Sequence, residues 1–108
     1  MRIYIIGGTG KTGRELIKQA LEQGHSVTAL VRNPNKVKIK NPNLTVIKGN
    51  VLDLKSFDSS IKGHDAVLSA LGHKRFIIIT SILSEGTKNI ITAMQQQNVK
   101  RLICITSL

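Results

Sequence analysis

The feature that most constrains this chain is the glycine-rich stretch at residues 7–13, Gly-Gly-Thr-Gly-Lys-Thr-Gly. An apolar segment at residues 3–6 precedes it, and apolar residues at the spacing of one helix face follow it, at Leu16, Ile17, Ala20 and Leu21. This order predicts a strand, a tight turn and a helix. Glycine lets a phosphate approach the backbone closely, and the free N–H groups and dipole at a helix start attract the anion. We therefore predict that this stretch holds a phosphate.

Two spacings typical of dinucleotide-binding turns overlap here, Gly8-x-Gly10-x-x-Gly13 and Gly7-x-x-Gly10-x-x-Gly13. A P-loop is one alternative, because Gly10-Lys11-Thr12 matches the end of that motif. Its first glycine would stand five residues before Gly10, however, where Ile5 lies inside the expected strand. The other alternative is a turn that binds nothing. So many glycines would then cost backbone entropy on folding with no ligand binding to compensate. The dinucleotide site is the favoured interpretation.

Length and composition indicate one globular domain over residues 1–108. The chain has 41% hydrophobic residues and two prolines, which argues against disorder. No long apolar segment resembles a signal peptide or a membrane span, so we expect a cytoplasmic protein. Cys104 is the one cysteine, lies in an apolar run and has no His or Cys partners at metal-ligand spacing. We expect a buried thiol there and no metal site.

The chain is strongly basic, with 16 Lys and Arg against six Asp and Glu and a formal net charge of +10. Such a balance raises nucleic acid or an anionic membrane surface as partners. The cations are scattered, however, apart from one cluster at Arg32, Lys36, Lys38 and Lys40, and few aromatic side chains are present to stack on bases. We therefore expect solvated surface charge that attracts polyphosphate ligands, and neither a nucleic-acid nor a membrane partner.

Strand and helix patterns alternate along the chain. Further strands are predicted at residues 26–31, 44–48, 65–71 and 101–106. The first helix should end at Gly24, a short helix should run from an Asp53 cap to Gly63, and a third should run from Ile82 to Gln97. The predicted fold is α/β: a Rossmann-like, doubly wound parallel sheet of five strands in the order 3-2-1-4-5 with helices on both faces.

Two segments are ambiguous by composition. Residues 36–40 alternate between basic and apolar side chains, and we interpret them as a loop between two Asn-Pro-Asn turns rather than as an edge strand. Residues 76–80 have a strand-like composition, but their length and place suit a loop over the bound ligand, which leads to a helix capped by Ser81.

Arg32 indicates the type of dinucleotide. A cofactor with a free ribose 2′-hydroxyl usually meets Asp or Glu at the end of the second strand, yet Arg32 occupies this position and no acid follows nearby. A guanidinium favours a 2′-phosphate, and Lys11, Lys36 and Lys38 would add to the field. We predict NADP over NAD. The alternative is that Arg32 is simply the solvated end of a strand.

These motifs together resemble one family. The matching segments, in order, are residues 7–13, Val31-Arg32, Gly49-Asn50-Val51, Ala70-Leu71-Gly72, residues 84–90 and Thr106-Ser107. Over its whole length the chain resembles atypical short-chain dehydrogenases with an NmrA-like NADP-binding domain, closest to the biliverdin and flavin reductase branch. The resemblance implies these contacts: Gly7, Thr9, Gly10, Lys11, Thr12 and Gly13 with the phosphates, Arg32 with the 2′-phosphate, Asn50-Val51 with the adenine, Leu71-Gly72 with the middle of the cofactor, and Ser107 near the nicotinamide.

The chain departs from the family at two points. Family members commonly have Asp at the position of Asn50, whose amide oxygen can still accept from the adenine amine. They also continue past the Thr-Ser pair, whereas this sequence stops at Leu108, so we expect the amino-terminal part of a longer family fold. Ser107 is the candidate catalytic group, able to hydrogen-bond a substrate carbonyl, with a solvated strand end as the alternative. His73 could contact ribose or substrate, or be a solvated loop histidine.

Two functions remain open from the sequence. One is an NADPH-dependent reductase of a flavin, quinone or similar planar acceptor. The other is a non-catalytic NADP-binding module that serves as a redox sensor or is a truncated relic. Oxidation of NADPH with added flavin or quinone would separate them. We also predict a homo-oligomer through the fifth strand, because Ile103 and Ile105 would leave an apolar sheet edge unpaired.

Overall fold

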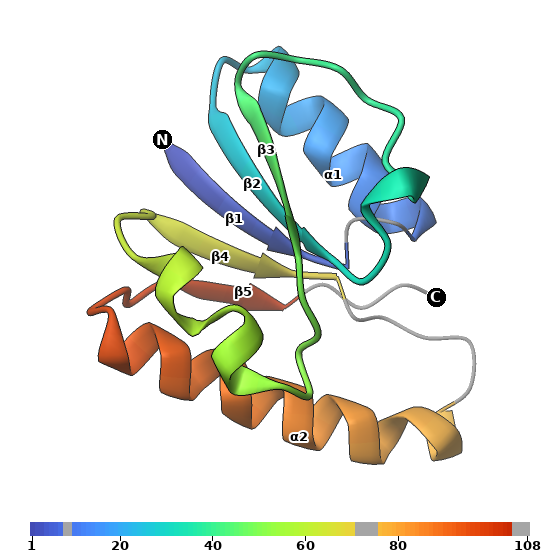
Figure 1. Ribbon diagram of the computed structural model, residues 1–108, viewed down its shortest axis with the longest axis vertical. Helices are drawn as coiled ribbons and strands as arrows, with labels where there is room; N and C mark the ends of the chain where they lie inside the picture. Colours follow the sequence, from blue (N-terminus) through green and yellow to red (C-terminus); the bar gives the residue numbers. More distant parts are fainter. Residues whose placement is uncertain (8–9, 71–75, 105–108) are drawn as a thin grey trace.

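The strands form one parallel sheet in the predicted order. A computed structural model of the chain describes residues 1–7, 10–70 and 76–104, with side chains in the last range described from residue 85 to 103. The five strands lie in the order β3-β2-β1-β4-β5, and every neighbouring pair is parallel (Figure 1). Their bounds are β1 Arg2–Ile6, β2 Ser26–Val31, β3 Leu44–Lys48, β4 Ala66–Ser69 and β5 Leu102–Cys104. The predicted fold class is confirmed.

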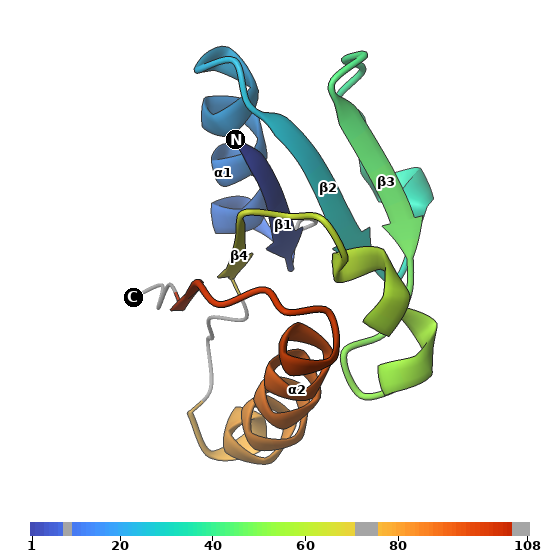
Figure 2. The ribbon, with the colours of Figure 1, turned by 90° about the vertical axis from the view of Figure 1, so that its left-hand side faces the viewer.

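Two helices cover opposite faces of this sheet, as Figures 1 and 2 show. Because alternate side chains of a strand point to opposite faces, β1 feeds two cores. Ile3 and Ile5 pack with α1 (Lys11–Glu22), whereas Tyr4 and Ile6 pack with α2 (Phe76–Gln96). The sheet is therefore buried on both sides, which explains the nearly continuous apolar runs of β1 and β2.

Helix α1 ends in a Schellman motif. Gly24 has a φ of +86°, its N–H donates to Leu21 O at 3.0 Å, and the N–H of His25 donates to Ala20 O at 3.1 Å. Glycine takes this left-handed conformation at little cost, so the prediction that the helix ends at Gly24 is confirmed.

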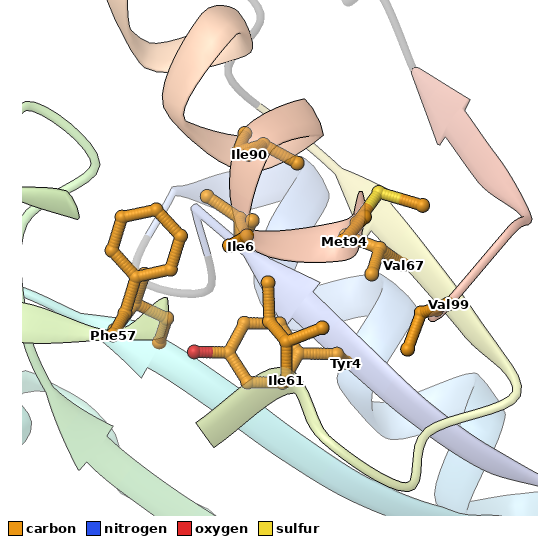
Figure 3. Close-up of a cluster of buried hydrophobic side chains, with 10 residues drawn as sticks. Tyr4, Ile6, Phe57, Ile61, Val67, Ile90, Met94 and Val99 are labelled. Carbon is orange, nitrogen blue, oxygen red and sulfur yellow. The ribbon is translucent and has the colours of Figure 1, made fainter. Parts of the chain in front are cut away.

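The core on the α2 side is built around Tyr4 and Phe57. Figure 3 shows both rings gathered with Ile61 and with Ile90 and Met94 of α2. The hydroxyl of Tyr4 lies 2.6 Å from Ser60 Oγ. Burial raises the pKa of Tyr4 to about 12, against the opposing effect of the hydrogen bond with Ser60. Tyr4 is thus a structural residue of this core.

The segment between β3 and β4 differs from its prediction. Two 3₁₀ turns, η2 (Leu54–Ser56) and η3 (Asp58–Ile61), replace the single short helix that we expected. Asp53 stands at the start of η2 but its side chain makes no capping hydrogen bond. Ser56 Oγ instead donates to Asp53 O at 2.7 Å, and such local side-chain bonds compete with a regular helix. Leu54, Phe57 and Ile61 of this segment nevertheless reach the core.

Helix α2 also corrects a prediction. It begins at Phe76, so residues 76–80 are helical rather than a loop, and Ser81 lies inside the helix rather than at its cap. β-Branched residues lower helix propensity by only a fraction of a kcal/mol each, which the surrounding helical context overrides. By contrast, residues 37–41 form no strand, and only a short 3₁₀ turn, η1 (Pro34–Lys36), precedes them. The interpretation of residues 36–40 as a loop is confirmed.

Strand β5 forms one edge of the described sheet. Ile103 in this strand and Ile91 in α2 are 46% and 42% exposed, so apolar side chains do reach the surface there. Ile105 and the side chain of Cys104 lie outside the described residues. The buried thiol and the assembly through this edge stay predictions. Within the described ranges, neither α1 nor α2 combines the length and hydropathy that a membrane span needs.

A buried histidine links three elements on the α2 side of the sheet. His64 is 8% exposed, and its ring meets that of Tyr4 edge-on with centroids 5.2 Å apart. Its Nδ1 lies 3.0 Å from Ile61 O, which can only accept, so Nδ1 carries the proton. Nε2 then accepts from the Thr28 hydroxyl at 2.8 Å. Burial lowers the pKa of His64, and the Arg2 charge adds to this while the backbone bonds and Asp65 oppose it.

The His64 environment predicts acid sensitivity. The unfolded chain takes up the His64 proton near pH 6.5, whereas the folded protein does so only at lower pH. The unfolded state therefore binds more protons between these two values, and stability is lost as the pH falls through that window. We expect the urea midpoint of the parent to drop from pH 7.5 to pH 5 by more than that of the His64→Gln protein. The His25→Gln control retains His64 and should keep the parent's loss; equal losses in the parent and His64→Gln would refute the assignment.

Candidate functional site

The glycine-rich stretch lies at the carboxyl end of β1, where it turns the chain into α1. Gly7 has a φ of +87°, a left-handed conformation that favours glycine. Its carbonyl accepts the N–H of Gly10 at 3.3 Å, which closes the turn. Gly8 and Thr9 lie outside the described residues. The strand, turn and helix that the sequence predicts are all present.

Unlike Gly7, Gly10 has a backbone conformation that does not require glycine. It caps α1 with φ −74° and ψ 167°, a conformation that any residue adopts. A Cβ built at Gly10 would meet only Gly7 O, at 3.7 Å, which is an ordinary contact. Neither backbone strain nor packing against the described protein therefore explains this glycine. The missing side chain leaves the backbone at Gly10 open to a ligand, as a pyrophosphate requires.

The start of α1 offers backbone N–H donors that have no partner inside the helix, beside Gly10. The first hydrogen bond of the helix runs from Arg14 N to Gly10 O at 2.9 Å. The N–H groups of Lys11, Thr12 and Gly13 come before it and have no carbonyl partner within the helix. The first turn carries no acidic residue, while the exposed Lys11 adds a positive charge. This arrangement suits an anion.

A second anionic subsite is indicated at the ends of β2 and β3. An open cleft of about 390 Å³ is lined by Arg32, Lys48, Gly49, Asn50 and Ser56. None of these lining residues is acidic. The cleft lies at the same carboxyl edge of the sheet as the glycine turn, because parallel strands end together (Figure 1). The sequence predicted Arg32 and Asn50 here but missed the other three residues.

Gly49 and Ser56 shape the floor of this cleft. A Cβ on Gly49 would lie 2.7 Å from Leu30 Cδ1 and 3.1 Å from Ser56 Oγ. Both distances are too short, so only glycine fits here without rearrangement. Ser56 Oγ accepts from Asn50 N at 3.0 Å and is also within hydrogen-bond distance of the carbonyls of Asn50 and Asp53. Ser56 therefore fixes the loop after β3, because its one proton and one of its two acceptor lone pairs are used by the loop backbone.

Asn50 and Val51 are each held by a further contact. The side-chain oxygen of Asn50 accepts the N–H of Leu52 at 2.9 Å, so its amide nitrogen and the second lone pair of the oxygen remain for a ligand. The Val51 carbonyl accepts from Asn89 Nδ2 of α2 at 2.8 Å. Asn89 thus positions this loop from across 38 residues of sequence, a role that no local pattern could reveal.

The structure brings together the described part of the predicted site and separates it from two histidines. Gly7, the start of α1, Arg32 and the Asn50-Val51 loop follow three adjacent strands at one sheet edge. His25 lies at the opposite edge, 3.1 Å from the amino terminus, and His64 is buried in the core. The predicted residues Thr9, Leu71, Gly72, His73 and Ser107 lie outside the described ranges.

Comparison with known proteins identifies the class. A family model described as NAD(P)H-binding matches residues 7–108. The chain belongs to this NAD(P)H-binding family, and the resemblance to atypical short-chain dehydrogenases is confirmed. A nicotinamide dinucleotide is therefore the class of ligand, and the glycine turn with the start of α1 is the candidate site for it.

The relatives include a protein named as a reductase homolog and one named as an assembly factor. The photosystem II assembly factor Ycf39 of Synechocystis is 32% identical over 95% of this chain and 32% of its own length. An isoflavone reductase homolog of Solanum tuberosum is 32% identical over 93% of this chain and 33% of its own length. Among solved structures, a Rossmann-fold NAD(P)-binding family protein from Shigella flexneri superimposes with a TM-score of 0.78 at 28% identity, covering 94% of this chain and 49% of the other. The chain spans about a third of the length of these curated relatives.

Proposed function

We propose that this chain is the NADP(H)-binding part of an NADPH-dependent reductase. The observation that carries the proposal is Gly10, because neither its conformation nor its contacts with described residues require a glycine. It lies at the start of α1, whose first turn has no acidic residue. The basic cleft beside Arg32 supports the phosphorylated form of the cofactor, because a guanidinium pairs well with a phosphate.

In this proposal, different residues at the sheet edge contact different parts of the cofactor. The N–H groups at the start of α1 and Lys11 would hold the pyrophosphate, Arg32 the 2′-phosphate, and Asn50-Val51 the adenine. Leu71-Gly72 would lie along the middle of the cofactor and His73 near its ribose, as the family resemblance implies. The bound nicotinamide supplies the hydride, and the protein supplies orientation and exclusion of water. Ser107 is proposed to hydrogen-bond the carbonyl of the acceptor.

The proposed acceptor is a flavin, quinone or similar planar molecule. A relative named as an isoflavone reductase homolog supports a reductase. A second candidate function is a non-catalytic NADP-binding module, which is favoured by the relative named as a photosystem II assembly factor.

The deciding experiment follows absorbance at 340 nm while the purified protein is incubated with NADPH and either FMN or a soluble quinone. A reductase consumes NADPH in proportion to protein concentration, whereas a binding module quenches or shifts NADPH fluorescence without turnover. Absence of NADPH binding in the same fluorescence titration would refute both functions.

Replacing Arg32 with Asp should reverse the cofactor preference. The carboxylate repels a 2′-phosphate and can accept from a free ribose 2′-hydroxyl, so NADPH should bind about 100-fold more weakly while NADH binding is kept or improved. Fluorescence titration of both cofactors measures the change. The control is Arg101→Asp, the same charge change at an exposed residue that precedes β5, at the opposite edge of the sheet. An Arg32→Asp protein that keeps the parent's ratio of NADPH to NADH affinity would place the 2′-phosphate elsewhere.

A further inference from the structure

The cleft at the ends of β2 and β3 contains a second cation that the sequence gave no reason to select. Lys48 is the last residue of β3 and is exposed, like Arg32. The register of the parallel pair sets Val31 beside Lys48, and Arg32 follows Val31 directly. Both cationic side chains line the same open cleft. The proximity of these two residues is a consequence of strand pairing, since 15 residues separate them in the sequence.

The cleft is richer in hydrogen-bond donors than in acceptors. Guanidinium and ammonium groups can only donate hydrogen bonds. The Ser56 hydroxyl donates to the loop backbone and accepts from Asn50 N, and the Asn50 amide oxygen already accepts from Leu52, so each of these two oxygens keeps one lone pair at most. Two like charges that line one cleft repel each other unless an anion lies between them. A phosphate monoester, with about two negative charges and three acceptor oxygens, matches this set.

We propose that Lys48 is the second ligand of the cofactor's 2′-phosphate and thereby a determinant of specificity for NADP over NAD. This inference rests on the proposed function and adds a residue to its site. Arg32 supplies the planar, bidentate contact, and Lys48 supplies a point charge from the edge strand of the sheet. The cleft thus selects the phosphorylated ribose with two cations contributed by adjacent strands.

The test compares affinities for NADPH and NADH in the Lys48→Met protein, which keeps most of the apolar side-chain stem and removes the charge. Loss of one charge-assisted hydrogen bond should weaken NADPH binding by about 10- to 100-fold. NADH lacks the 2′-phosphate, so its affinity should stay within about twofold. Lys48→Arg should restore most of the NADPH affinity. The matched control is Lys62→Met, which removes one exposed lysine at the opposite edge of the sheet and should leave both affinities unchanged.

Three outcomes overturn the inference. If Lys48→Met binds NADPH as tightly as the parent, Lys48 makes no contact with the 2′-phosphate. If NADPH and NADH affinities fall by the same factor, Lys48 acts on a part that both cofactors share. If Lys62→Met reproduces the loss of NADPH affinity, only the overall charge of the protein matters. A parent protein that binds neither cofactor would instead refute the proposed function, which is a distinguishable result.

Discussion

The Gly10→Val protein should fold normally and bind NADPH at least about 100-fold more weakly than the parent, a loss on the order of a few kcal/mol. Gly10 has an extended conformation that β-branched residues accept, and among the described residues a Cβ there makes only an ordinary contact, with Gly7 O. The two methyl groups would instead occupy the space through which a pyrophosphate approaches the start of α1. Circular dichroism checks the fold, and fluorescence titration measures the affinity.

The control for this variant is Gly24→Val at the other end of α1. A Cβ at Gly24 meets no atom of the described residues within 4 Å, but its φ of +86° is strained for any residue with a side chain. Gly24→Val should therefore lose about 1–2 kcal/mol of unfolding free energy and keep its affinity for NADPH. The two substitutions should therefore affect different properties: Gly10→Val lowers NADPH affinity, and Gly24→Val lowers stability. A folded Gly10→Val protein with the parent's affinity would remove the glycine stretch from the cofactor site.

The Phe57→Ala substitution should cost about 3–5 kcal/mol of unfolding free energy, because it deletes a large side chain that is 1% exposed. Phe57 joins the two 3₁₀ turns to the core beside Tyr4, Ile61 and α2 (Figure 3). A domain of this size is stable by about 5–15 kcal/mol in total, so the loss is a large share. Urea denaturation at constant pH measures the change as a lower midpoint.

Leu52→Ala is the matched control for Phe57→Ala. Leu52 is a large apolar residue in the same connection between β3 and β4, but it is 48% exposed. Its truncation should change the unfolding free energy by no more than about 0.5 kcal/mol. Similar losses at both positions would show that the core does not depend on the burial of Phe57.

Much of the fold follows from patterns within short windows of the sequence. Strands β2 and β3 have the bounds that their apolar runs predict, and Gly24 ends α1 through its left-handed conformation. The order of the sheet follows from the alternation of strands and helices with right-handed crossovers. The glycine turn is also local, because strand, turn and helix are consecutive. The local sequence was less informative at residues 76–80. Their composition favours a strand, but in the structure they form the first residues of α2.

Other features depend on residues that meet only in the folded chain. In the sequence Gly49 looks like an ordinary loop glycine. Only the fold shows that Leu30 and Ser56 leave no room for a side chain there. Asn89 reaches the Val51 carbonyl from α2, and the buried His64 pairs with Thr28 from 36 residues away. Each of these contacts joins separate elements, and their distances are set by the sheet and the helices packed on it.

The sequence by itself determined the class of ligand, because a glycine turn between a strand and a helix supplies backbone donors to a phosphate wherever it occurs. Only the tertiary structure decided which side chains line the cleft at the ends of β2 and β3. Lys48 is one of many scattered lysines in the sequence and becomes a partner of Arg32 because the β2–β3 register places Val31 beside it. The donors of a backbone motif come from consecutive residues, so a short stretch of sequence is enough to identify them. The charges of a cleft come from separate strands, and only the pairing of those strands in the sheet brings them together.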